Sequence, residues 1–418
     1  MKVVFVNRFF FPDTSATSQI LSDLAFHLAA DCEVHVVTSR LRYDVPDDPL
    51  PARENVRGVA VVRVWTSRFG RSSLVGRTID YATFYVSALW RVLRLASRGD
   101  IVVALTDPPL ISVPIAWAAR AKRAVLINWL HDIFPEIATE LDFSRWPAWV
   151  GRALAWMRDR SLDTARCNVV LGERMREFLT ARGIDGSRLS VIQNWASGTD
   201  IRPLSPQDNP LRREWGIGSE FVVGYSGNMG RAHELTTVLE AARLLSDTRD
   251  IRFVLVGGGK QRTALEAIAS ENGLANITFQ PYQPRERLRE TLTLPDCHIV
   301  SLKPALEGLV VPSKVYGCLA AGRPVIFLGS DDGEIGRLIA ASPGFGICVH
   351  PEDSSGLVSV IQRLRSDAAL TASMGQTARR LFESRYDQPA AFARWRAVLA
   401  RAGTWVPGAG PADSRVEL

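Results

Sequence analysis

A segment in the last third of the chain places a carboxylate ahead of a Pro-Ser-Lys sequence. Glu307 follows a predicted strand, and Pro312, Ser313 and Lys314 open a helix predicted near 313–321. Ser313 is a favourable N-cap residue, and Pro312 helps to fix the approach of the chain to the helix. Lys314 stands in the first turn, where the positive end of the helix dipole disfavours a cation unless an anion is bound. The segment therefore predicts an anion site, with an ordinary helix start as the alternative.

A glycine-bearing loop follows the apolar run Val222–Tyr225, which predicts a strand. The residues of this loop with candidate binding roles are Gly227, Asn228, Gly230, Arg231 and His233. Glycines let the backbone approach a ligand closely, and the N-terminus of a helix predicted at 233–247 offers unpaired N–H groups. With further donors from Arg231 and His233, the loop is suited to a diphosphate. A tight turn without a ligand is the alternative.

Three consecutive glycines begin at Gly257, directly after another predicted strand. A dinucleotide-binding fingerprint would need a further glycine where Arg262 stands, and a P-loop would need Ser or Thr where Gln261 stands. Neither motif is complete. Gly257 and Gly258 therefore remain candidates for a general nucleotide contact.

In the first half of the chain, His131 and Asp132 directly follow the apolar run Val125–Leu130. Parallel sheets bind their ligands beyond the carboxyl ends of the strands, so this pair is a candidate for the chemistry of the site. A structural histidine is the equally weighted alternative.

The elements that must position these loops alternate in type. Strand Val3–Val6, a helix with apolar residues at helical spacing between Ile20 and Leu28, and strand Val34–Thr38 form a βαβ unit. The alternation continues along the chain, which predicts an α/β fold with parallel sheets and helices on both faces.

Two consecutive doubly wound domains follow from this pattern. A linker with three prolines near 195–212 separates an N-terminal domain, 1–200, from a C-terminal domain, 201–387. The tail 403–418 is rich in glycine and proline and is predicted to be disordered. With two such domains, the cleft between them is the expected site.

Composition and charge exclude several classes. Hydrophobic residues make up 46% and charged residues 22%, as in ordinary globular proteins. No apolar run approaches the ~20 residues that span a bilayer, and the N-terminus predicts no signal peptide, so we expect a cytoplasmic protein. The five cysteines form no Cys-x-x-Cys pair, which predicts no zinc site. The net charge of +6 and the absence of a recognised motif argue against nucleic acid as a partner.

Aromatic residues and arginines are interleaved in two segments, 74–98 and 146–156. Basic amphipathic helices with aromatic residues are suited to the surface of an anionic membrane. The sequence therefore predicts peripheral association with such a surface. The equally weighted alternative is an apolar stripe that faces the core, flanked by snorkelling arginines.

Taken together, these loops resemble those of the retaining glycosyltransferases of the GT-B fold, family four, and the subgroup that acts in O-antigen, capsule and colanic-acid-type assembly. The resemblance covers about residues 1–400. The residues that carry it are His131-Asp132 with Phe134-Pro135-Glu136, Tyr225-Ser226-Gly227-Asn228-Met229-Gly230, Glu307 with Pro312-Ser313-Lys314, and Ala320-Ala321-Gly322-Arg323-Pro324.

The resemblance implies roles for several residues. A nucleotide sugar would be held by the C-terminal domain, with its diphosphate near Gly230, Arg231 and Lys314. His131 would reach toward the donor sugar, and Glu307 would lie beside it as the first Glu of the family's paired-glutamate motif. UDP-sugars are favoured as donors, with GDP-sugars as the second choice. A helix at 388–402 would pack back on the N-terminal domain.

The chain also departs from the family pattern. The second Glu of the paired motif aligns with Gly317, so Tyr316 is the candidate for contact with the ribose. The glycine-rich loop of the N-terminal domain is replaced by hydroxyl-bearing residues. Three of these residues, Thr14, Ser15 and Thr17, are the candidate acceptor-side residues, together with Asp132.

The resulting hypothesis is a retaining glycosyltransferase that needs no metal or other cofactor, since no Asp-x-Asp motif appears. It would transfer a sugar to a lipid-linked or polysaccharide acceptor at the inner face of the cytoplasmic membrane. Two alternatives remain: a non-catalytic scaffold subunit of glycosyltransferase type, and a nucleotide-sugar epimerase of the same architecture.

Overall fold

The computed structural model describes residues 2–43, 49–70, 74–143 and 146–403. The chain divides into two compact units. Unit 1 comprises Met1–Ile192 and Phe392–Leu418, and unit 2 comprises Gln193–Ala391. The division thus falls after Ile192 rather than at the predicted position 200, and the predicted disordered tail from 404 onward lies outside the described residues.

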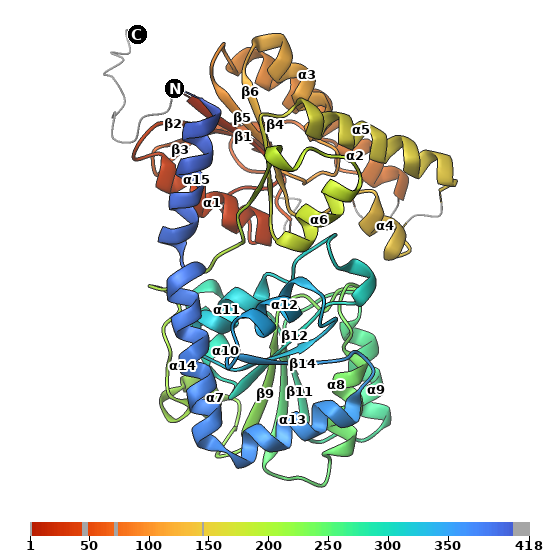
Figure 1. Ribbon diagram of the computed structural model, residues 1–418, viewed down its shortest axis with the longest axis vertical. Coiled ribbons are helices and arrows are strands. Elements are labelled where there is room, and N and C mark those ends of the chain that lie inside the picture. Colours follow the sequence, from red (N-terminus) through yellow and green to blue (C-terminus); the bar gives the residue numbers. More distant parts are fainter. Residues whose placement is uncertain (1, 44–48, 71–73, 144–145, 404–418) are drawn as a thin grey trace. The chain divides into compact units, whose positions relative to one another are not determined.

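Unit 1 is built on an eight-stranded sheet of order β3-β4-β2-β1-β5-β6-β7-β8 (Figure 1). The strands are β1 (Lys2–Val6), β2 (Glu33–Ser39), β3 (Arg53–Val56), β4 (Val59–Val64), β5 (Ile101–Ala104), β6 (Val125–Leu130), β7 (Cys167–Val170) and β8 (Leu189–Val191). The helices are α1 (Ala16–Leu28), α2 (Leu74–Leu95), α3 (Ser112–Lys122), α4 (Glu136–Glu140), α5 (Ala148–Thr164), α6 (Glu173–Ala181) and α15 (Gln388–Ala402). All pairings except β3–β4 are parallel.

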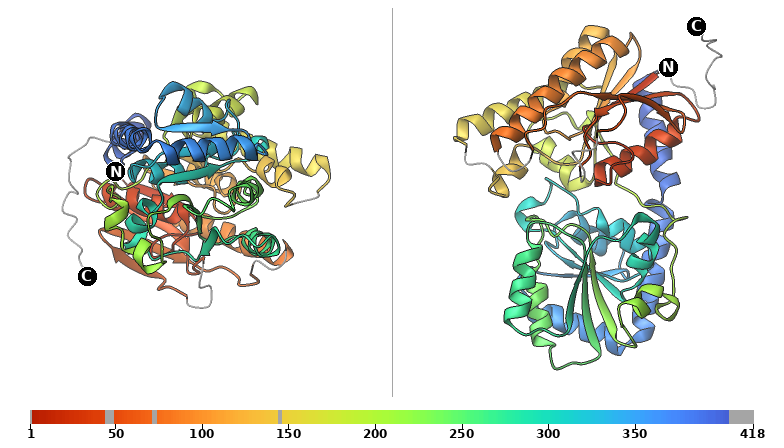
Figure 2. Two further views of the ribbon diagram at one scale, coloured as in Figure 1. Left: turned by 90° about the horizontal axis from the view of Figure 1, so that it is seen from below. Right: turned by 180° about the vertical axis from the view of Figure 1, so that it is seen from behind.

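Unit 2 is built on a six-stranded parallel sheet of order β11-β10-β9-β12-β13-β14. The strands are β9 (Phe221–Ser226), β10 (Ile251–Val256), β11 (Ile277–Gln280), β12 (Cys297–Ser301), β13 (Val325–Leu328) and β14 (Gly346–Val349). The helices are α7 (Pro210–Glu214), α8 (Thr236–Leu244), α9 (Arg262–Glu271), α10 (Leu288–Thr293), α11 (Lys314–Ala320), α12 (Glu334–Ala341), α13 (Ser354–Ser366) and α14 (Ala368–Arg385). Helices cover both faces of each sheet, so the predicted doubly wound architecture is confirmed (Figures 1 and 2).

The strands are apolar because helices cover both faces of each parallel sheet, so the side chains on either face are shielded from water. Val3 to Val6 of β1 are completely buried, between β2 and β5. Val4 and Val6 face a core to which α2 and α3 contribute Phe84 and Ile115. Continuous apolar runs of this kind are the sequence signature of buried parallel strands.

The edge strand β3 was not predicted. Its sequence, Arg53-Glu54-Asn55-Val56, is half exposed and has no apolar run. It pairs antiparallel with β4 through a turn in which Arg57 and Gly58 both have positive φ, 50° and 84°. Two successive residues with positive φ are typical of a type I′ hairpin turn, whose twist matches that of the flanking strands.

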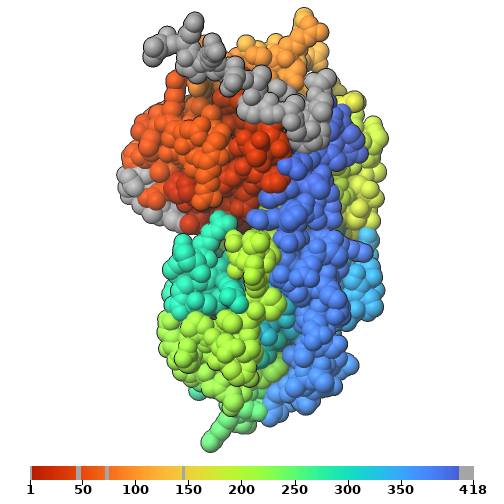
Figure 3. Space-filling view, turned by 90° about the vertical axis from the view of Figure 1, so that its left-hand side faces the viewer, coloured from red at the N-terminus to blue at the C-terminus, as the bar shows by residue number. Residues whose placement is uncertain are grey.

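Helix α15 covers unit 1 through contacts along its length (Figure 3). The ring of Phe392 stacks on His27 of α1 with centroids 4.2 Å apart, and Arg396 pairs with Asp31. The fully buried Trp395 packs edge-on against Trp129 of β6, at 4.5 Å between centroids. The last helix of the chain thus completes the core of the first domain.

Helices α2, α3 and α5 lie side by side on one face of the first sheet, with α3 in contact with both neighbours (Figures 1 and 2). In the part of the chain that the structure describes, no helix is long and apolar enough to cross a bilayer.

Replacement of Trp395 by Ala is expected to destabilise unit 1, because the cavity would open at the contact with Trp129. A buried Trp→Ala change costs about 3–5 kcal/mol, which corresponds to a fall of roughly 10 °C in the unfolding midpoint of a domain this size. Differential scanning calorimetry tests this. Trp117→Ala on the surface of α3, where the side chain is 59% exposed, is the control and should shift the midpoint little. Equal effects of the two changes would contradict the packing role of α15.

Candidate functional site

The ammonium group of Lys314 lies at the carboxyl ends of β9 and β12 in unit 2. Its Nζ donates a hydrogen bond to Oη of Tyr225, and lies 3.9 Å from the centroid of that ring. It also lies 3.4 Å from Nε2 of His233. Tyr225 is the fifth residue of β9, and His233 stands in the loop that follows. The two segments that the sequence singled out separately therefore meet at Lys314.

The orientation of His233 is set by the end of β12. Its Nδ1 lies 2.6 Å from the carbonyl oxygen of Ser301, which can only accept, so Nδ1 carries the proton. Nε2 is then the acceptor that faces Lys314. Burial and the nearby Lys314 lower the pKa of His233 to about 3, so the imidazole is neutral at pH 7.

Lys314 is a partly buried cation with neutral neighbours. Burial lowers its pKa to about 7. Within the described residues it forms no ion pair with a carboxylate, and its partners Tyr225 and His233 are both uncharged at this pH. An ammonium without a protein counter-ion is stabilised when an anion binds, because the desolvation cost is then offset by charge attraction. The arrangement is suited to a phosphate or diphosphate.

The loop after β9 is held against the loop after β10. Gly227 lies beside Lys314: a Cβ added to it would stand 3.4 Å from Cε of the lysine. Gly257 has φ of 140°, and a Cβ there would stand 2.0 Å from the carbonyl oxygen of Gly227. The amide of Met229 donates to the carbonyl of Gly258 at 2.6 Å. Gly257 thus has a packing reason to be glycine, independent of any nucleotide.

The remaining residues of the β9 loop are fixed by backbone contacts. Oη of Tyr225 donates to the carbonyl of Asn228 at 2.7 Å, and the amide side chain of Gln261 donates to the carbonyl of Gly230. Arg231 is exposed. Helix α8 begins at Thr236, and not at 233, so this loop does not pass directly into a helix as predicted.

Glu307 contacts the start of α12. Its Oε2 accepts the amide N–H of Glu334 at 3.0 Å, and a Cβ added to Gly333 would overlap its carboxylate. The carboxylate therefore stabilises a helix N-terminus, where a negative charge is favoured. Ser313 stands at the N-cap position of α11, but its hydroxyl makes no capping hydrogen bond, contrary to the prediction. Pro312 precedes it and accepts, through its carbonyl, from the amide of Val315 at 3.2 Å.

The position of Tyr316 does not favour the predicted contact with a ribose. Its side chain is 2% exposed, and its ring packs against Tyr386 at 5.0 Å between centroids. At Gly317, a Cβ would lie 3.1 Å from Cδ1 of Leu292, so a larger residue there would displace that leucine. The position of the missing glutamate is thus in contact with an apolar side chain.

In unit 1, His131 and Asp132 follow β6 as predicted. The side chain of His131 is buried beside Trp129, and its backbone N–H donates to Thr106 at 3.3 Å. Nε2 of His131 is buried and makes no hydrogen bond with the described residues. Burial lowers its pKa to about 4, and burial together with Asp107 raises the pKa of Asp132 to about 6. His131 is therefore a neutral imidazole whose buried Nε2 has no hydrogen-bond partner among the described residues.

Asp13 organises the predicted acceptor-side loop, a role that the sequence did not reveal. Its Oδ1 accepts the N–H of Ser15 at 2.8 Å, and Oδ2 accepts that of Tyr43. Thr14 is exposed, and Thr17 lies in the first turn of α1. The carboxylate of Asp13 thus joins the residue before α1 to Tyr43, which lies 30 positions further along the chain.

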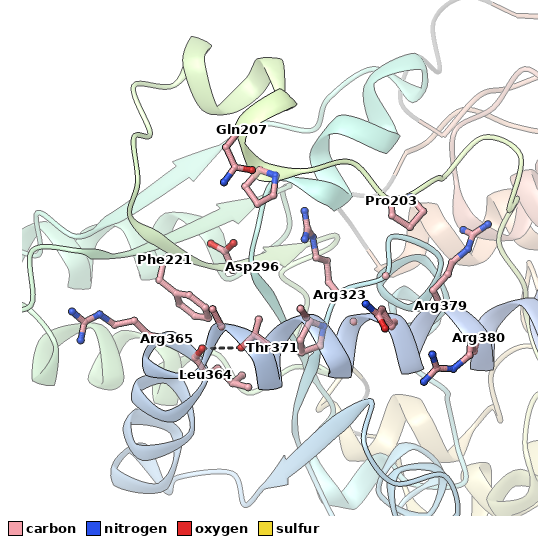
Figure 4. Close-up of a pocket in the computed structure, with 17 residues that line it drawn as sticks. Pro203, Gln207, Phe221, Asp296, Arg323, Leu364, Arg365, Thr371, Arg379 and Arg380 are labelled. Atoms are coloured by element: carbon pink, nitrogen blue, oxygen red, sulfur yellow. Dashed lines mark hydrogen bonds between the residues drawn. The ribbon is translucent and has the colours of Figure 1, made fainter.

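A cavity of about 670 Å³ lies elsewhere in unit 2 (Figure 4). It is lined by residues that precede or begin β9, β12 and β13, among them Phe221, Asp296 and Arg323. This is the amino edge of the sheet, opposite to Lys314. Arg323 donates to the carbonyls of Leu204 and Thr293 at 2.8 and 2.6 Å, so it ties the linker to unit 2. None of the candidate donor-binding residues lines this cavity.

The fold has many solved counterparts. Sucrose-phosphate synthase from Thermosynechococcus elongatus superposes with a TM-score of 0.76 at 16% identity, over 96% of this chain and 98% of that one. HepE from Anabaena, solved with UDP and glucose, gives 0.71 at 17% identity over 96% of this chain and 99% of its own. At this identity the likeness establishes the fold alone.

Two family models match in succession: the glycosyl transferase 4-like domain over residues 16–195, and glycosyl transferases group 1 over residues 207–381. The chain is a glycosyltransferase of the GT-B fold. The glycosyltransferase is 31% identical over 184 residues to the putative colanic acid biosynthesis glycosyl transferase WcaI of Escherichia coli (strain K12), a match that spans 44% of this chain and 45% of that protein. It is 27% identical over 273 residues to the probable glycosyltransferase WbjE of Pseudomonas aeruginosa, spanning 64% and 67%. The match to WcaI thus spans less than half of the length of that protein. The family models and these relatives support membership of glycosyltransferase family four.

The buried ammonium of Lys314 is expected to make stability depend on pH. Between pH 7 and the ordinary lysine pKa of 10.5, the unfolded chain carries this proton and the folded chain does not, so the stability of the wild type rises with pH. Below pH 7 both states are protonated and the full burial cost applies. In the absence of ligand, the unfolding midpoint of Lys314→Met minus that of the wild type should therefore be largest near pH 6. This difference should decrease toward pH 10. Calorimetry across this range measures it.

Lys260→Met, at an exposed lysine of the neighbouring glycine loop, is the matched control for removal of a lysine charge. A Lys314→Met difference that does not change with pH would contradict the lowered pKa of Lys314.

Proposed function

We propose that the enzyme is a retaining, metal-independent transferase that uses a nucleotide-diphosphate sugar, with UDP-sugars favoured and GDP-sugars as the alternative. The observation that carries the proposal is the ammonium of Lys314, held by Tyr225 and His233 without a protein counter-ion. The Anabaena relative in fold was solved with UDP-glucose, which supports the donor class.

In the proposed reaction, the bond between the anomeric carbon and the diphosphate oxygen breaks, and a bond from the acceptor hydroxyl oxygen to the same face of that carbon forms. The hydroxyl proton passes to the departing phosphate. Negative charge grows on the diphosphate as the bond breaks, and Lys314 stabilises it without reorganisation, because its position is already fixed. Protonation of Lys314 is favoured by the same charge.

His131 and Glu307 are proposed to contact the donor sugar, as the family resemblance implies. The unpartnered Nε2 of the neutral His131 supports a hydrogen bond to a sugar hydroxyl rather than a charge on the leaving group. Glu307 is already used at the start of α12, so we assign it a positioning role through that helix as well as a sugar contact.

We further infer that the acceptor is lipid-linked or a polysaccharide, in cell-surface glycan assembly of the O-antigen or colanic-acid type, at the inner face of the cytoplasmic membrane. The name of the Escherichia coli relative, colanic acid biosynthesis glycosyl transferase, supports this class.

A thermal-shift screen of the purified chain against UDP, GDP, ADP and dTDP, with their common sugar conjugates, tests the donor. At a hundredfold excess over its dissociation constant, a ligand of the folded state adds about 2.7 kcal/mol of stability. We expect UDP to raise the unfolding midpoint in wild type and not in Lys314→Ala. A response to another nucleotide would correct the base, and a response to none of them would contradict the proposal.

Replacement of Lys314 by Ala should lower the turnover number by about 10²–10³-fold, the range for loss of one preorganised electrostatic contact in a transition state. Sugar transfer or donor hydrolysis, measured by nucleotide release, gives the readout. Arg243→Ala removes an exposed cation of α8 that pairs with Glu240, and should leave the rate unchanged. Full activity of Lys314→Ala would exclude the assigned role.

A further inference from the structure

The exposed side of α2 is apolar along most of its length. The exposed residues Val75, Ile79, Ala82, Val86 and Trp90 follow one another at intervals of three or four and form one stripe. The opposite side of the helix, with Phe84, Ala88 and Val92, is buried in the core of unit 1. A helix that is apolar on both sides is expected to be covered on both sides. Here the outer stripe contacts solvent.

Neighbouring helices continue this stripe. Trp117 of α3 is 59% exposed, and Trp149 and Trp156 of α5 are 65% and 62% exposed, with Met157 beside them. Because α3 packs between α2 and α5, the exposed sides of the three helices adjoin one another (Figures 1 and 2). We call the exposed side chains of α2, α3 and α5 the three-helix face. Isolated exposed apolar residues are ordinary, but a contiguous group of large ones marks a binding surface.

Unit 2 has no comparable group. Its exposed large hydrophobic residues, among those the structure describes, are Leu244, Ile268 and Tyr282. The concentration of exposed tryptophans in unit 1 is therefore a property of the three-helix face rather than of the whole surface.

The charge of the three-helix face is positive. Its exposed cations include Arg94, Arg120, Arg152 and Arg160. The three helices contain only three carboxylates. Asp80 is buried, Asp159 pairs with Arg158 at 2.7 Å, and Asp163 is the one exposed acid, near the end of α5.

Cations and rings are also adjacent on this face. The guanidinium of Arg94 lies 4.4 Å from the ring centroid of Trp90, and that of Arg160 lies 5.8 Å from Trp156. Tryptophan prefers the boundary between headgroups and acyl chains, and arginine binds the phosphates just above it.

The buried Asp80 extends the face toward the loop before α2. Its Oδ1 accepts from the hydroxyl of Ser67 at 2.6 Å and from the amide of Phe69 at 3.0 Å, and Oδ2 accepts from Gly70 at 3.0 Å. The loop is thereby fixed against α2, with the ring of Phe69 exposed. A bulky apolar residue held in this way by a buried carboxylate adds a further anchor at the end of the stripe.

We propose that the three-helix face binds the surface of an anionic lipid bilayer, with its tryptophans among the headgroups and its arginines on lipid phosphates. Charge complementarity selects the occupant, because an anionic bilayer offers extended negative charge and an apolar layer beneath it. The inference shares with the proposed function only the location of the acceptor, and lipid binding itself requires no transfer activity.

Co-sedimentation of the full chain with protein-free vesicles tests the proposal. The vesicles contain phosphatidylcholine alone, or with phosphatidylglycerol at roughly one lipid in three, near the anionic content that gives a surface potential of about −30 mV. We expect binding to the anionic vesicles at low salt, weaker binding at high salt, and little binding to phosphatidylcholine alone. Failure to bind anionic vesicles would overturn the proposal.

Two variants separate the contributions of charge and apolar contact. Arg94→Gln/Arg120→Gln/Arg152→Gln should weaken binding roughly a hundredfold, since each arginine near the surface contributes about fivefold. Trp90→Ala/Trp149→Ala/Trp156→Ala should weaken it at least about tenfold and reduce the quenching of tryptophan emission by lipids with brominated chains, with Trp117 left on the face. Leu244→Ala/Ile268→Ala in unit 2 is the control and should bind as wild type does.

Folding and function are read separately. Each variant should keep the unfolding midpoint of the wild type, since the altered side chains are exposed, and Lys314→Ala should bind vesicles normally. Loss of transfer in Lys314→Ala with retained vesicle binding would support both proposals independently. Equal vesicle binding by wild type and both face variants would overturn the lipid proposal. Binding to native membranes but not to protein-free vesicles would also overturn it, and would assign the face to a membrane protein.

Discussion

The interaction on which the site of unit 2 depends is the contact of one buried ammonium with two neutral partners. Lys314 opens α11, Tyr225 belongs to β9, and the carbonyl of Ser301 at the end of β12 fixes the tautomer of His233. A buried lysine that had a carboxylate partner would be stable without ligand and poorly suited to a second anion. Among the described residues the cation has no such partner, which supports the proposal that an anion binds there.

The same loops also show how packing and function share residues. Gly257 is required by its contact with the carbonyl of Gly227, and Glu307 is required by the amide at the start of α12. A glycine or carboxylate at a strand end is therefore not by itself a sign of a ligand. The stronger signs are atoms that the fold leaves without a partner, such as Nε2 of His131.

Unit 1 combines two surfaces with opposite properties. The ends of its strands carry polar residues such as Asp13 and His131, whereas the outer sides of α2, α3 and α5 carry tryptophans and arginines. The segments 74–98 and 146–156 carry this mixture in the sequence. The predicted apolar stripe that faces the core is present in α2, and association with a membrane surface stays a prediction. Phe84 and its neighbours face the core, while Trp90 lies outside. One helix thus satisfies the core and still presents an apolar stripe.

The sequence by itself determined the α/β class and the two doubly wound domains, because buried apolar runs that alternate with helical spacing are local patterns. The last helix at 388–402 was implied by the family resemblance, and the roles of the loops at the strand ends stay predictions. The sequence did not predict β3, a polar strand at the edge of the sheet. It also did not distinguish the side of α2 that faces the core from the side that is exposed. The tertiary structure alone decided that Tyr225 and His233 hold Lys314, that Tyr316 is buried, and that Asp13 fixes its loop. These outcomes depend on contacts between residues tens of positions apart, whose energies arise from burial and charge that no local pattern records.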